Sequence, residues 1–73
     1  MNIKEAEKLS GVSSRNIRFY EQKGLIKPRR NTENDYREYS EEEIQRLKLI
    51  RALRMVDMPM DQIRKVIDGK VPL

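Results

Sequence analysis

Apolar residues recur at helical spacing near both ends of the chain. Ile3, Ala6 and Leu9 predict a short helix over residues 2–9, with these three side chains on its inward face. Near the other end, the spacing i, i+3, i+6, i+7 predicts an amphipathic helix over residues 60–68. Four apolar side chains form its inward face: Met60, Ile63, Val66 and Ile67.

A second helix is predicted over residues 14–23, and its two sides differ in character. Serines at its start can accept from unpaired backbone N–H groups, and Gly24 follows its end, where glycine adopts the left-handed conformation without steric cost. At roughly 100° per residue, Ile17 and Tyr20 fall on the inward side. The opposite side carries hydrogen-bonding groups and an aromatic ring: Ser14, Arg15, Arg18, Phe19 and Gln22.

The longest helix is predicted to begin after Ser40, because the sequence SEEE supplies a capping box in which Glu43 reaches back to Ser40. Its apolar residues spread most of the way around the helix: Ile44, Leu47, Leu49, Ile50, Ala52, Leu53, Met55 and Val56. A helix that is apolar on more than one side packs on more than one side. We therefore expect a central strut between the first two helices and the last one.

Between the second and third helices the pattern changes from helical to extended. The segment 27–30 is expected to be extended because a residue before Pro28 is pushed out of helical space. Turn-forming residues follow at 31–35, and residues 36–39 have high β-propensity. We expect a small β-hairpin, here called the wing, over residues 27–39, with at least one tyrosine ring packed on the core.

A short helix, a glycine-containing turn and a second helix with a polar outer face form a helix-turn-helix over about residues 2–24. Gly11 permits the tight turn, and Val12 supplies an apolar plug between the helices. In such units the second helix enters the major groove of DNA. An ordinary helical hairpin has the same pattern, so the pattern alone leaves both interpretations open.

Composition limits the function classes. The chain has 73 residues, with no cysteine and no histidine, so we expect one domain with a modest core. The usual nucleophile–base pairs and zinc sites need those residue types. Neither an enzyme nor a metal or cofactor is therefore expected. The apolar runs are too short for a membrane span, and the charged N-terminus is unlike a signal peptide, so we expect a cytoplasmic protein.

The charge is concentrated in one segment. The whole chain carries +4, whereas residues 14–30 contain six basic residues and one acidic residue, so the remainder sums to −1. This concentration favours an anionic partner over a solvating role. Arginine can bond guanine bidentately, glutamine suits adenine, and an aromatic ring can lie against a thymine methyl. The outer face of the second helix therefore favours double-stranded DNA as the partner.

The chain resembles the N-terminal DNA-binding domain of MerR-family transcriptional regulators over nearly its whole length. Three segments carry the resemblance, in this order and spacing: GVSSRNIRFYEQKGLI (11–26), NDYREYSEEE (34–43) and MPMDQIRKVI (58–67). The resemblance implies a mainly α fold, a winged helix-turn-helix with a small hairpin followed by a helical pair at about 40–68. It also implies a sequence-specific DNA-binding module.

The resemblance further implies which residues contact DNA. Four residues of the second helix would meet the major groove: Ser14, Arg15, Arg18 and Phe19. Tyr20 would anchor that helix, with its hydroxyl reaching a phosphate. Three wing residues and one residue of the long helix would contact the backbone: Tyr36, Arg37, Tyr39 and Arg51.

The sequence departs from the family pattern at two places. Many members have Asn-Gly at the wing turn, whereas this chain has Asn34-Asp35; aspartate tolerates turn geometry, so a wing with a different tip is still expected. Family members usually continue into a long helix that pairs as an antiparallel coiled coil and dimerises on inverted-repeat operators. A homodimer is expected here only if such a helix follows Leu73, in a longer regulator rather than a naturally short relative.

Two other functions remain compatible with the sequence. An excisionase-like architectural factor can use a similar compact winged module. A helical protein-interaction adaptor needs no nucleic acid, and its binding would survive high salt and would not depend on Arg15 or Arg18.

Overall fold

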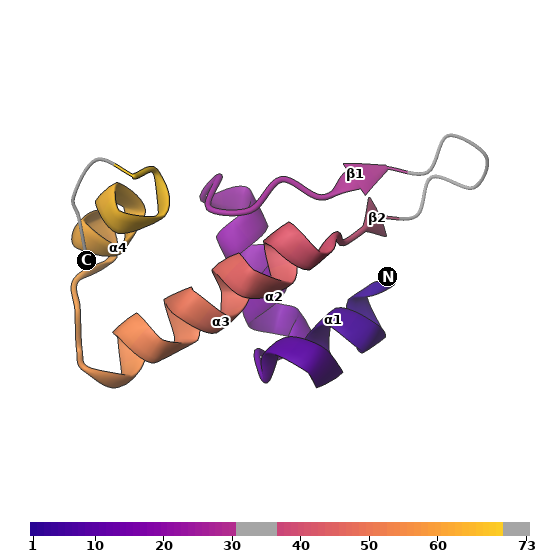
Figure 1. Ribbon diagram of the computed structural model, residues 1–73, viewed down its shortest axis with the longest axis horizontal. Helices are drawn as coiled ribbons and strands as arrows, with labels where there is room; N and C mark the ends of the chain where they lie inside the picture. Colours follow the sequence, from indigo (N-terminus) through magenta and orange to yellow (C-terminus); the bar gives the residue numbers. More distant parts are fainter. Residues whose placement is uncertain (31–36, 70–73) are drawn as a thin grey trace.

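The computed structural model describes residues 1–30 and 37–69, and its order of elements matches the predicted mainly α fold with a small hairpin (Figure 1). The two strands pair antiparallel, with Arg29 opposite Glu38 and Arg30 opposite Arg37. The predicted wing turn at Asn34-Asp35 lies outside the described residues. The elements are α1 (Ile3–Ser10), α2 (Ser14–Gln22), β1 (Arg29–Arg30), β2 (Arg37–Glu38), α3 (Glu41–Met55) and α4 (Met60–Ile67).

The helix starts are fixed by side-chain caps. At α1, the Asn2 carboxamide oxygen accepts from the Glu5 N–H at 2.9 Å, and the Glu5 carboxylate accepts from the Asn2 N–H. Ser40 and Glu43 form the predicted capping box at α3, with the Ser40 N–H donating to the carboxylate at 3.1 Å. Ser13 caps α2 by accepting from a backbone N–H. Each cap satisfies backbone donors that have no partner inside the helix.

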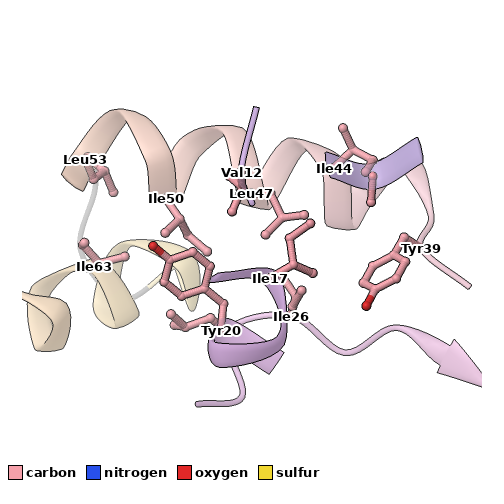
Figure 2. Close-up of a cluster of buried hydrophobic side chains, with 12 residues drawn as sticks. Val12, Ile17, Tyr20, Ile26, Tyr39, Ile44, Leu47, Ile50, Leu53 and Ile63 are labelled. Atoms are coloured by element: carbon pink, nitrogen blue, oxygen red, sulfur yellow. The ribbon is translucent and has the colours of Figure 1, made fainter. Parts of the chain in front are cut away.

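One line of side chains on α3 forms the centre of the core. Ile44, Leu47, Ile50 and Leu53 are buried and recur every third residue. They face the inward side of α2 and Ile63 of α4, as Figure 2 shows. The core therefore fixes the rotation of α2, because its inward residues pack directly against the strut.

The apolar residues of α3 are less widely buried than the prediction of packing on more than one side implies. Ala52, Met55 and Val56 are exposed, with Met55 at 73% exposure, and burial follows a single line. Both α1 and α4 contact α3, and the buried side chains of α2, α3 and α4 belong to one core cluster. Leu49 is partly buried against the core, and the other apolar side chains of the helix are left at the surface.

The predicted inward face of α1 also needs a correction. Leu9 is 54% exposed, and Ser10 takes the buried position instead. The Ser10 hydroxyl donates to the Ala6 carbonyl at 2.6 Å and accepts from the Val12 N–H at 3.1 Å. A buried hydroxyl with both bonds made is tolerated in the core, and it sets the rotation of α1 so that Leu9 points outward.

The junctions between helices depend on left-handed backbone at two places. Gly11 has φ 75° in the helix-turn-helix turn, as its sequence position predicts. Asp57, after α3, has φ 58°, and its N–H donates to the Arg54 carbonyl while the Met58 N–H donates to Leu53. These bonds end α3 sharply and set the direction in which α4 leaves. Among residues 1–30 and 37–69, no helix combines the length and apolar character required to cross a membrane.

Candidate nucleic-acid interface

The two sides of α2 lie as the sequence predicts. Ile17 and Tyr20 are buried against the core. The opposite side is exposed and carries two guanidinium groups, from Arg15 and Arg18, together with the Phe19 ring. An arginine-bearing helix face turned away from the core is the arrangement that a major-groove helix requires.

Phe19 is held in place although it is 40% exposed. Its ring meets the Tyr20 ring edge to face, with centroids 5.7 Å apart. The Lys23 ammonium lies 5.5 Å from the Phe19 centroid, within the range of a cation–π contact. The Phe19 ring is therefore anchored at its base by α2 itself and presents its remaining surface to the outside.

The N-terminus of α2 is bonded to α1 by a residue that the sequence analysis did not single out. The Glu7 Oε2 atom accepts from the Ser14 N–H at 2.5 Å and from the Ser14 hydroxyl at 2.9 Å. The backbone bond from Ser14, followed by its hydroxyl bond, lowers the pKa of Glu7. Only the packing of α1 on α2 brings these groups together, so no local sequence pattern could have revealed the pair.

The C-terminal end of α2 is held by α4. The Arg64 guanidinium donates to the Lys23 carbonyl oxygen, and it lies beside Gly24, where the chain turns away from the helix. A cation at this end is also stabilised by the negative pole of the helix. Contacts from two different helices therefore fix the two ends of α2.

The wing is joined to α2 by an ion pair. The Arg37 Nε atom lies 2.7 Å from the Glu21 Oε2 atom, and the arginine side chain remains 41% exposed. Arg37 was predicted as a phosphate contact, and the structure adds that its guanidinium also bridges β2 to the end of α2. Glu21 is the second residue that the sequence analysis missed as part of this surface.

The predicted contact from Tyr39 was wrong, because its side chain is only 1% exposed and points into the core (Figure 2). Burial raises the pKa of the Tyr39 hydroxyl, the Glu21 charge raises it further, and the charges of Arg37 and Arg18 oppose the shift. The prediction that at least one wing tyrosine packs on the core is confirmed by Tyr39. Tyr36, the other predicted wing tyrosine, lies outside the described residues.

Tyr20 and Arg51 border one shallow depression between the helix-turn-helix turn and the second half of α3. The Tyr20 ring is buried, as an anchor of α2 should be. Arg51 is exposed, and its guanidinium lies so close to the turn that a Cβ on Gly11 would meet its Cζ atom at 3.4 Å. The structure therefore places the Arg51 charge beside the turn that leads into α2.

Within residues 1–30 and 37–69, no group of three or more acidic, cysteine or histidine side chains could hold a metal ion. The charged groups gathered around α2 can instead make hydrogen bonds and ionic contacts to a large anionic partner.

Comparison with known proteins finds a family model and sequence relatives that agree on one family. A family model described as MerR HTH family regulatory protein matches residues 1–70. The heavy metal-dependent transcription regulator 2 of Rhizobium meliloti (strain 1021) is 45% identical over 67 residues, covering 92% of this chain and 46% of the relative. The HTH-type transcriptional regulator CueR of Escherichia coli O6:H1 is 37% identical over 68 residues, covering 93% of this chain and 50% of CueR.

A solved structure agrees with these sequence relatives. The transcription regulator PbrR691 from Ralstonia metallidurans CH34, crystallised with lead(II), superposes with a TM-score of 0.84 at 36% identity. The match covers 96% of this chain and 55% of PbrR691. The chain thus spans about half the length of the curated relatives that it matches.

The relatives named above are transcriptional regulators, which confirms the predicted class and favours it over an excisionase-like factor, an adaptor or an enzyme. The family model extends over nearly all of the chain, from the first helix through the last. The chain therefore belongs to the MerR family of helix-turn-helix regulatory proteins, as a DNA-binding module of a transcriptional regulator.

Proposed function

We propose that α2 enters the major groove of an operator half-site and that four of its residues contact the bases there: Ser14, Arg15, Arg18 and Phe19. The observation that carries this proposal is the orientation of α2. Arg15, Arg18 and Phe19 project from the side opposite Ile17 and Tyr20, which are buried in the core. A rigid helix with its base-reading groups outward loses little conformational freedom on binding.

Contacts to the phosphate backbone would position this helix without reading sequence. Arg37 is suited to this role because it is exposed and already joined to α2 through Glu21. Tyr36 would act beside it, and Arg51 would contact a phosphate near the helix-turn-helix turn, where the structure places its charge. Tyr20 would anchor α2 from the core and offer its hydroxyl at the border of the same depression.

If a coiled-coil helix follows Leu73, the regulator would bind as a homodimer on an inverted repeat, and it would act in the cytoplasm on a promoter. Family resemblance supports this part of the proposal. Footprinting of the full-length protein would then protect two half-sites related by a dyad, whereas a single protected half-site would contradict the dimer.

The contacts proposed for α2 are tested by Arg18→Ala. Selection from randomised duplexes at low salt, followed by affinity measurements on the preferred and mismatched sites, should show weaker discrimination. We expect a loss on the order of 1–3 kcal/mol at the contacted base pair, because a bidentate arginine–guanine contact is removed. Arg46→Ala is a matched control, since the Arg46 guanidinium on α3 is already paired with Glu42 at 2.9 Å.

The control should keep the base preferences of the native chain. If neither Arg18→Ala nor Arg15→Ala changes discrimination while the variants remain folded, the assignment of α2 to the major groove is wrong.

A further inference from the structure

Glu7 and Ser14 form one hydrogen-bonded unit where α2 begins. Both Ser14 donors, its N–H and its hydroxyl, are directed to the same carboxylate oxygen of Glu7. Glu7 is exposed, and the pair borders an open surface depression next to the two lysines of α1. The unit therefore faces outward at the end of α2 that approaches base edges in a helix-turn-helix.

The outward groups of this unit can only accept hydrogen bonds. A serine hydroxyl has one proton, and Ser14 gives that proton to Glu7. What remains is the lone-pair capacity of the Ser14 Oγ atom and the second carboxylate oxygen of Glu7, which has no hydrogen-bond partner among the described residues. Ser14 in this arrangement cannot donate to a phosphate, and an ionised carboxylate repels one.

Starting from the proposed function, we propose that Glu7 is a specificity-determining residue that accepts a hydrogen bond from the N4 amino group of a cytosine in the major groove, with Ser14 holding its carboxylate in position. Cytosine suits an acceptor-only unit because its major-groove edge presents a donor. Guanine presents two acceptors there, and thymine presents an acceptor and a methyl group. Adenine places its N7 acceptor directly beside its amino group, so a carboxylate meets repulsion there.

The test compares the native chain with Glu7→Ala and Glu7→Gln by selection from randomised duplexes, followed by affinity measurements on the four bases at each selected position. The native chain should prefer cytosine at one position by about five-fold or more, as a specific contact of 1–3 kcal/mol implies. Glu7→Ala should abolish that preference. Glu7→Gln should shift it to adenine, because an amide can bond the adenine N6 and N7 atoms together.

Asp61→Asn serves as the control, since it removes one exposed carboxylate from the first turn of α4. This variant should keep every base preference of the native chain. Thermal unfolding of all variants separates a reading role from a capping role, because loss of a helix cap lowers the melting temperature without changing which base is chosen.

If Glu7→Ala and Glu7→Gln retain the native preferences at every position, the inference is overturned while DNA binding through Arg18 stands. The inference is also overturned if the variants change the preference only at a position where the native chain prefers guanine or thymine. If the native chain shows no base preference anywhere, the proposed function itself fails, and the inference fails with it.

Discussion

The burial of single residues shows where sequence periodicity was sufficient to predict which side chains face the core, and where it was not. Ile17, Tyr20 and the arginines of α2 were placed correctly, because nine helical residues with a polar side leave one rotation that buries the apolar side. Tyr39 was misplaced because β2 is two residues long, too short for alternation to reveal which side chain turns inward. Leu9 was misplaced because a buried serine was not anticipated.

Tyr39→Phe tests the revised position of Tyr39. Its hydroxyl oxygen is buried and has no hydrogen-bond partner among the described residues. Removing such a group should leave the free energy of unfolding unchanged or raise it by about 1 kcal/mol. The affinity for DNA should also stay within about two-fold, because a side chain that DNA cannot touch contributes no direct contact.

Urea unfolding and DNA titration of Tyr39→Phe give both quantities. Tyr20→Phe is the companion variant, since the Tyr20 ring borders the surface near Arg51. A uniform loss of DNA affinity in Tyr39→Phe, with none in Tyr20→Phe, would restore Tyr39 to the interface.

At the scale of elements, the sequence predicted the helices but not the hydrogen bonds and ion pairs that join the elements. The capping residues, Gly11 and the apolar spacing are local signals, and they predicted the four helices. The pairs Glu7–Ser14, Glu21–Arg37 and Arg64–Lys23 join residues that meet only after the helices pack. Charged residues are common on helix surfaces, so nothing in the sequence marks which of them pair across elements.

A double-mutant cycle on Glu21 and Arg37 tests the tie between α2 and the wing. The variants Glu21→Gln, Arg37→Ala and their combination should give a coupling near the upper end of about 0.2–1 kcal/mol in the free energy of unfolding. We expect the upper end because the Glu21 side chain is only 23% exposed. The cycle isolates the pair from everything else that Arg37 contacts.

The same cycle on Glu42 and Arg46 is the comparison. That pair lies within α3 and is more exposed, so about 0.3–0.5 kcal/mol is expected. Equal couplings for the two pairs would mean that the link from wing to helix is no tighter than an ordinary surface pair.

At the scale of the molecule, the positive charge is concentrated on α2 and the start of the wing. Residues 14–30 hold an excess of basic side chains, while the remainder of the chain is nearly balanced. The order of residues in the sequence predicted this concentration, and the structure leaves Arg15 and Arg18 of α2 exposed. Attraction to phosphate should therefore contribute strongly to the affinity for any duplex.

DNA affinity should fall steeply as salt concentration rises, with a linear dependence of its logarithm on the logarithm of the salt concentration. Arg37→Ala should weaken binding to all sequences about equally and reduce the magnitude of that slope by about 1, as expected for one lost phosphate contact. Lys65→Ala, an exposed cation on α4, should leave the slope unchanged. A native affinity that ignores salt would rule out a phosphate-dominated interface and favour the adaptor interpretation.

The bond from Arg64 to the Lys23 carbonyl has a mechanical consequence. The direction of α4 is set by the left-handed turn at Asp57. From α4, the Arg64 guanidinium donates a hydrogen bond to the Lys23 carbonyl at the end of α2. A tilt of α4 must either drag the end of α2 with it or leave a backbone oxygen without its donor. A change in the direction of α4 is therefore expected to change the orientation of α2, and with it the positions of Arg18 and Phe19.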